Sequence, residues 1–83
     1  MQSVFVLQHL HILPGGEEDV KLIGVYRSLE AARSAAARLG TQSGFRDHPR
    51  IVDPEEDKDR QGFHLQEYPL DTDHWLEGYV TVT

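Results

Sequence analysis

Two histidines separated by a single residue, His9 and His11, could do more chemistry than any other pair in this chain. Alternate residues of a β-strand share a face, so the two imidazoles would lie about 6–7 Å apart at Cα. That spacing permits two-point binding of zinc or another borderline metal, although a complete site needs further ligands. The other interpretation is that both rings cap the apolar face of a strand. The metal-binding interpretation would make the chain a metal-binding protein or a minimal metal-dependent hydrolase.

Two turns also combine acids, bases and imidazoles. In one of them Arg46 could bind an anion and Asp47 could orient His48 as a base. Neighbouring side chains point in different directions, however, and Asp and Pro are ordinary turn formers, so a structural role is favoured. Residues 71–77 are acidic but lack the glycine and the spacing to the terminal glutamate that a calcium-binding loop has. Both segments are therefore interpreted first as turns.

Catalytic motifs are not evident in the sequence. The chain has no cysteine, which excludes thiolate catalysis, disulfides and cysteine-ligated zinc. Its paired glycines, Gly15 and Gly16, precede no predicted helix and so do not form a phosphate-binding loop. No nucleophile elbow of the GxSxG type is present. We therefore predict no catalytic residues and no cofactor, and we do not expect an enzyme.

Composition narrows the class of partner. Fourteen Asp and Glu against eight Lys and Arg give a formal net charge of −6, which disfavours binding to nucleic acid or to an anionic membrane surface. No apolar run approaches the roughly 20 residues of a membrane span, and the apolar start lacks the features of a signal peptide. The absence of cysteine suits a reducing compartment. We expect a cytoplasmic protein.

The elements that must position these side chains begin with a hairpin. Residues 4–13 and 20–27 are rich in β-forming residues and are separated by a polar turn. The first of these strands is apolar on both faces, a pattern typical of a strand in the centre of a sheet. Gly24, within the second strand, predicts a bulge or a close backbone approach.

A helix follows the hairpin. Ser28 is a typical N-cap, and Gly40 could end the helix in the left-handed conformation. The apolar positions recur at a spacing of three and four, and most of them are small, so we expect the helix to pack closely on the sheet. These positions are Leu29, Ala32, Ala35, Ala36 and Leu39.

The remaining segments complete a single domain over residues 1–83. Residues 41–62 are irregular, with Phe45 expected to pack onto the core and a mobile acidic loop at about 50–62. Two further strands are predicted at 63–68 and 74–82. The expected fold is α+β, with ββαββ order and one helix packed on one face of a four-stranded, mainly antiparallel sheet.

A helix on one face leaves the other face of such a sheet uncovered, and this gives the leading functional hypothesis. We predict that Phe5, Leu7, Trp75 and Tyr79 share the uncovered face and bind a partner, with Glu77 and His74 around them. The chain would then be a protein-interaction or regulatory module, and a homodimer is one form of this hypothesis. The acidic run at 53–59 suggests a variant of this hypothesis, in which the chain neutralises a basic protein as immunity proteins do.

Three stretches of the chain resemble a family of short bacterial proteins of unknown function. They are EEDVKLIGVYRSLEAA (17–32), GFRDHP (44–49) and DTDHWLEGYVTV (71–82). The family pattern is roughly EDxKLIGxYSSxEEA, then PGFRDxP, then DxDHWxEGF. This resemblance implies a compact α+β fold and no catalytic residues. The chain departs from the pattern between Pro49 and Gly62, where the acidic residues are additional.

Overall fold

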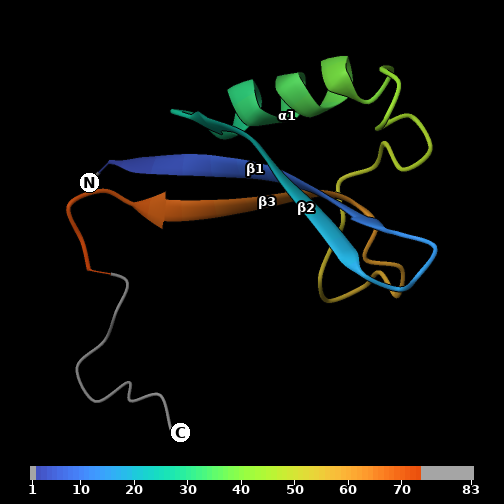
Figure 1. Cartoon of the computed structure of the whole chain (residues 1–83). Coiled ribbons are helices and arrows are strands. Elements are labelled where there is room, and N and C mark those ends of the chain that lie inside the picture. The colour runs from blue at the N-terminus through green and yellow to red at the C-terminus, as the bar shows by residue number, and fades with distance from the viewer. Residues whose placement is uncertain (1, 74–83) are drawn as a thin grey trace, which may run out of the picture.

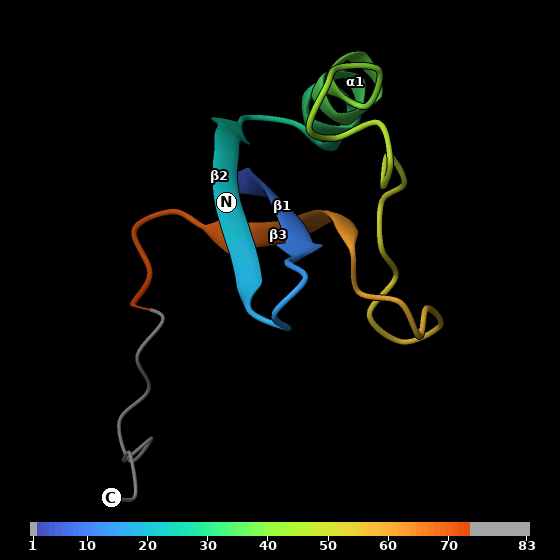
Figure 2. The ribbon, with the colours of Figure 1, turned by 45° about the vertical axis from the view of Figure 1, so that its right-hand side comes forward.

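The computed structural model describes residues 2–73. Within this range the three strands form one antiparallel sheet in the order β2-β1-β3, and the helix lies over one of its faces (Figures 1 and 2). The α+β class is therefore confirmed, with three strands rather than the four predicted. The segment predicted as the fourth strand, 74–82, lies outside the described residues. The elements are β1 (Ser3–Ile12), β2 (Glu18–Tyr26), α1 (Leu29–Leu39) and β3 (Gly62–Pro69).

The central position of β1 confirms the interpretation of its two apolar faces. Its pairing with β2 is interrupted once: Leu7 lies opposite Gly24 and Gln8 lies opposite Leu22, so Ile23 is an extra residue. This is the predicted bulge. A Cβ at Gly24 would lie 2.7 Å from the Tyr26 hydroxyl oxygen, so the close neighbour there is a side chain and not the backbone. Because of the extra residue, the residues of β2 that lie on the face away from α1 are even-numbered before the bulge and odd-numbered after it.

The core lies between α1 and the sheet. Leu7 and Phe63 are fully buried, and they pack against Ala35 and Ala36 of the helix. The small alanines let the helix backbone approach the sheet, as the sequence predicted. Larger side chains surround this centre and are only partly buried: Ile23, Tyr26, Leu39, Phe45 and Leu65.

Both ends of α1 are fixed locally. The Ser28 hydroxyl oxygen accepts a hydrogen bond from the Ala31 backbone N–H at 3.1 Å, as expected for an N-cap. Gly40 ends the helix, but its φ of −63° and ψ of −14° are right-handed, so the predicted left-handed cap is wrong. A Cβ at Gly40 would lie 3.0 Å from the Ala36 carbonyl oxygen and 3.2 Å from the Pro49 Cβ, so a larger residue would fit there tightly.

The long connection from α1 to β3 is attached to the sheet through apolar side chains at two points. Phe45 packs on the core, as predicted. Further along, Val52 is 5% exposed and its N–H donates to the Phe63 carbonyl at 2.8 Å, while the Phe63 N–H donates to the Arg50 carbonyl at 2.9 Å. The sequence did not predict the second attachment. No helix within residues 2–73 has the length and apolar character needed to cross a membrane.

Candidate functional site

The uncovered face of the sheet carries a row of apolar side chains. On β1 these are the even-numbered residues other than Gln8, and they alternate with the odd-numbered residues that face α1. On β2 they are the residues paired with them: Val20 opposite Leu10, Leu22 opposite Gln8, and Val25 opposite Val6. We call this surface the open face; its apolar members are Val4, Val6, Leu10, Ile12, Val20, Leu22 and Val25.

Exposure is greatest on β2. Leu22 is 64% exposed, Val25 is 57% exposed and Val20 is 49% exposed, whereas Leu10 of the central strand is nearly buried by its neighbours. Single exposed apolar residues are common on protein surfaces, but neighbouring ones on adjacent strands form a patch. This patch is the largest group of exposed apolar side chains that the described strands present on one face.

The structure reverses the predicted orientation of β1. Leu7, predicted as a partner contact, is fully buried beneath α1, and Phe5 lies on the same covered face, where it is half-buried. Neither belongs to the open face. The other predicted contact residues, Trp75, Tyr79, Glu77 and His74, lie outside the described residues.

Polar groups border the open face at its hairpin end and along β3. The Arg60 guanidinium lies 3.1 Å from the Glu18 carboxylate, and both side chains are largely exposed. His64 and Gln66 of β3 line a shallow hollow of about 190 Å³ between this ion pair and Leu10. An apolar centre with a polar border is the usual composition of a protein interface.

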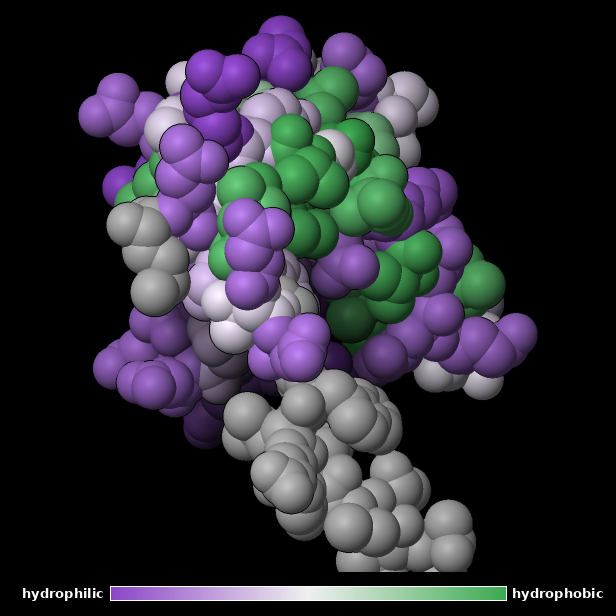
Figure 3. Space-filling view, turned by 90° about the vertical axis from the view of Figure 1, so that its left-hand side faces the viewer, coloured by the Kyte–Doolittle hydropathy of each residue, from purple (hydrophilic) through white to green (hydrophobic). Residues whose placement is uncertain are grey.

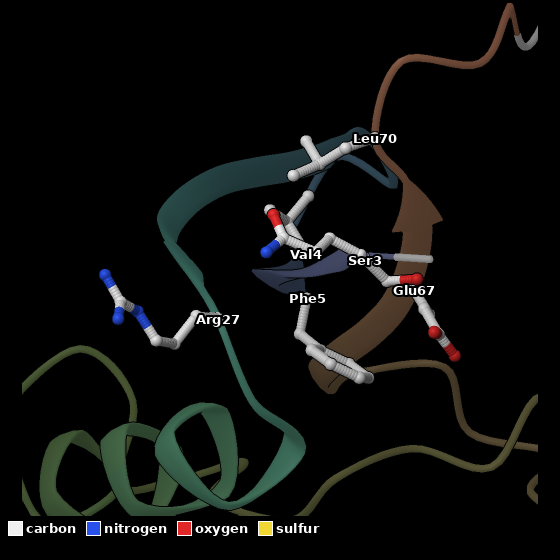
Figure 4. A pocket seen from close by; sticks show the side chains of 7 residues that line it. Ser3, Val4, Phe5, Arg27, Glu67 and Leu70 are labelled. Atoms are coloured by element: carbon white, nitrogen blue, oxygen red, sulfur yellow. The ribbon is translucent and has the colours of Figure 1, made fainter.

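Two larger hollows lie at the end of the sheet where β1 begins, and Figure 3 shows apolar side chains gathered at this end. The first has a volume of about 650 Å³ and is lined by side chains from both faces of β1, including Val4 and Phe5 (Figure 4). Its two charged residues, Arg27 and Glu67, lie on opposite sides, and Arg27 points away from the centre. The polar groups therefore do not converge on a common ligand position.

The second hollow, about 560 Å³ in volume, is a groove on the covered face. The start of α1 forms one wall through Leu29 and Arg33, and the α1–β3 connection forms the other. The floor is formed by Phe5 of β1 and Leu65 of β3. Most of these side chains are apolar, so the groove suits an apolar segment better than a charged ligand.

His9 is enclosed by the α1–β3 connection. It is 1% exposed, and its ring packs edge-on against Phe45 and Phe63, with centroids 4.7 and 4.8 Å away. The Nε2–H donates to the His48 carbonyl oxygen at 3.1 Å. Burial lowers the pKa of His9 below its usual value, the bond to His48 opposes this effect, and the positive charge of Lys21 lowers the pKa further. These contacts match the structural interpretation of this histidine.

The metal hypothesis gains no support from the described part of the chain. His11 is half-buried and its ring lies 5.6 Å from the ring of His48. Within residues 2–73, no group of three or more metal-binding side chains comes together. His9 is 1% exposed and its ring is enclosed by Phe45 and Phe63, so it is not presented as a ligand beside His11.

The acidic segment at 53–59 is organised by its own carboxylates. Asp57 accepts from the Asp53 backbone N–H at 2.7 Å and lies 2.8 Å from the Arg50 guanidinium, and these contacts lower its pKa. Asp53 accepts from the Glu55 backbone N–H at 2.9 Å. These are bonds of a solvated turn, so no contact in this segment favours the neutralising hypothesis.

The exposed residues of β2 were missed by the sequence reasoning. Both faces of β1 are apolar, so the alternation of β1 alone does not indicate which face the helix covers. The prediction placed Phe5 and Leu7 of the odd-numbered face outside, but Leu7 and His9 of that face are buried in the core. A signal was present in β2, because an extra residue next to Gly24, Ile23, changes which side chains share a face.

Comparison with protein-family models, with curated proteins and with solved structures found no match to this chain. The resemblance of its segments to a bacterial family therefore stays a prediction, and the candidate site rests on the geometry described above.

Proposed function

We propose that this protein is a small interaction module that binds through the open face, and that its first partner is a second copy of the same chain. The exposure of Leu22, Val25 and Val20 on adjacent positions of one surface supports this proposal. Burying a fully exposed leucine or valine side chain contributes about 1.5–3 kcal/mol, so burial of several half-exposed residues together offsets part of the cost of association.

A second copy fits the chemistry of this surface. A two-fold axis places the same apolar patch on both sides, so each leucine and valine meets an apolar neighbour. The nearest charges, Glu18 and Arg60, pair with each other at the border, so dimerisation buries no unpaired charge there. The net charge of −6 repels a second copy at long range, and added salt should therefore strengthen the dimer.

Three sequence predictions belong to this proposal. A four-stranded sheet would widen the open face, and Trp75 and Tyr79 are its predicted additional contacts, with Glu77 and His74 around them. A cytoplasmic location agrees with the absence of cysteine. A partner that is neither nucleic acid nor membrane agrees with the acidic charge.

The test is the mass of the protein in solution, measured by size-exclusion chromatography with light scattering. We expect the wild-type chain to be a dimer at high micromolar concentration and Leu22→Lys to be a monomer, because a lysine would have to be buried against its own copy. Leu13→Lys is the matched control: Leu13 is 37% exposed in the hairpin turn, away from the open face, and this variant should stay dimeric.

A wild-type chain that stays monomeric throughout this concentration range would refute self-association. Equal loss of dimer in Leu22→Lys and Leu13→Lys would show that added charge, and not the open face, controls the association. Circular dichroism of each variant confirms that it remains folded.

A further inference from the structure

The groove on the covered face follows one edge of the sheet. Its floor residues Phe5 and Leu65 come from β1 and β3, and its walls carry Leu29 of the helix and Ile51 of the connection. Leu29 is 37% exposed and Ile51 is 40% exposed. The described residues thus leave apolar side chains on both walls of the groove in contact with solvent.

The backbone along the groove has unused pairing capacity. Phe63 directs both its N–H and its carbonyl away from β1, to Arg50 and Val52. Strand geometry repeats every second residue, so Leu65 and Glu67 direct their backbone groups the same way. Within residues 2–73 no strand pairs with β3 on that side beyond the bridge between Ile51 and Phe63.

We propose that residues 74–82 of the same chain fill this groove as a strand paired antiparallel to the free edge of β3. The connection is short, since β3 ends at Pro69 and the turn at 70–73 follows directly. Antiparallel neighbours need only such a turn. Nine residues in a strand extend about 30 Å, which is ample for the free part of β3 beside the groove.

The side chains of residues 74–82 alternate in character, and this alternation suits the two faces of the sheet at the edge of β3. Leu76, Val80 and Val82 alternate with Trp75, Glu77 and Tyr79. A register with Leu76 opposite Glu67 directs Leu76 into the groove beside Leu29. A shift by one residue would set Glu77 opposite Glu67, and like charges in directly opposed positions are destabilising. The pairing ends before Phe63, where Ile51 already occupies the edge, so residues 74–79 pair with β3 and residues 80–82 continue past the paired part.

The same register also determines which residues of β3 lie beside the side chains on the other face of the segment 74–82. Trp75 and Tyr79 then lie beside the β3 residues of the open face, Tyr68 and His64.

The inference goes beyond the proposed function, because the groove can be filled in a chain that never dimerises. To separate filling of the groove from dimerisation, the test is carried out on Leu22→Lys, the variant designed to be monomeric. Its mass is checked by light scattering.

The first measurement is hydrogen exchange at single-residue resolution by NMR. We expect the amides of residues 76–78 that face β3, and the outward amides of Leu65 and Glu67, to exchange at least about a hundredfold more slowly than in an unstructured chain. Rapid exchange of all the amides in 74–82, with Leu65 and Glu67 equally unprotected, would overturn the proposal.

The second measurement is a double-mutant cycle in urea unfolding. Leu76→Ala should raise the unfolding constant about tenfold or more, and by clearly less when Leu29 is already alanine, because the two side chains share the groove. Leu70→Ala is the matched control: Leu70 is 40% exposed and lies outside the groove, so its effect should be the same in both backgrounds. Additive effects of Leu76→Ala and Leu29→Ala would count against the proposal. Protection that appears only in a dimeric sample would assign the groove to a second copy and overturn it.

Discussion

His9 shows how a single polar side chain can fix a long connection. It is buried on the covered face, and its two aromatic neighbours come from different segments, Phe45 from the connection and Phe63 from β3. A phenylalanine would fill the same space, but only a histidine also donates to the His48 carbonyl. The residue therefore satisfies a backbone acceptor of the connection while packing as an apolar ring.

A pH dependence of stability follows from this environment. Burial lowers the pKa of His9 from 6.5 in the folded chain, with Lys21, His48 and His11 as charged or titratable neighbours. The unfolded chain thus binds more protons than the folded chain between the two pKa values. The contribution of His9 to stability is complete above 6.5 and is lost as the pH falls through the folded pKa.

Urea unfolding at about pH 7.5 and at about pH 5 checks this expectation. The wild-type chain should lose stability at the lower pH, and His9→Phe should lose less. At the higher pH, His9→Phe should itself cost about 1–3 kcal/mol, because the His48 carbonyl is left without its donor. His64→Gln, a change on the other face, is the control and should keep the wild-type difference. An identical pH difference in His9→Phe would refute the assignment.

At the scale of elements, the junction between the connection and β3 depends on one glycine. Gly62 has a φ of +140°, and a Cβ there would lie 2.6 Å from the Arg50 carbonyl oxygen. This lets the chain at 50–52 run beside the start of β3, where Val52 is buried against the core. The acidic residues that follow are thus held at both ends, and their predicted mobility stays a prediction.

The free-energy cost of the close approach at Gly62 can be measured by comparing alanine substitutions at two glycines with positive φ, Gly44 and Gly62. Gly44 has a φ of +98°, but a Cβ there would meet no atom within 4 Å. Gly44→Ala should cost roughly 1–2 kcal/mol, because only the backbone is strained. Gly62→Ala carries the same strain and also displaces Arg50, so its free energy of unfolding should fall further. Equal losses in urea unfolding would show that the close approach at Gly62 has no energetic weight.

The whole molecule depends on a small core. Its centre, Leu7, Phe63, Ala35 and Ala36, contains only two large side chains, and the residues around it are partly exposed. Small domains bury a low share of their surface and lie at the lower end of protein stability. Phe63 contacts the core, His9 and Phe45 together, so it links the sheet, the helix and the connection.

Phe63→Ala should therefore destabilise the entire fold. Replacing a buried phenylalanine by alanine costs about 3–5 kcal/mol, which in a domain of this size lowers the Tm by at least roughly 12 °C. Leu13→Ala, in the exposed hairpin turn, should change the Tm only slightly. Thermal unfolding followed by circular dichroism provides both values. A Tm within a few degrees of wild type for Phe63→Ala would contradict this description of the core.

The sequence by itself determined the features that neighbouring residues encode. The Ser28 cap, the helix that follows it, the bulge at Gly24 and the central place of β1 all depend on local backbone chemistry and on the pattern of apolar residues. Phe45 also follows from sequence, because a large apolar residue in a polar loop has few other favourable positions. Each of these features would be encoded in the same way in many tertiary settings.

Only the tertiary structure decided which face of β1 is covered. Both faces are apolar, so the choice depends on how well the helix alanines fit over Leu7 and Phe63, residues far apart in the chain. That fit buries His9 and leaves Leu22 exposed. The burial of His9 in turn depends on its hydrogen bond to the His48 carbonyl. Contacts between distant segments set these positions, because burial energy is summed over the whole packed arrangement and not over a local pattern.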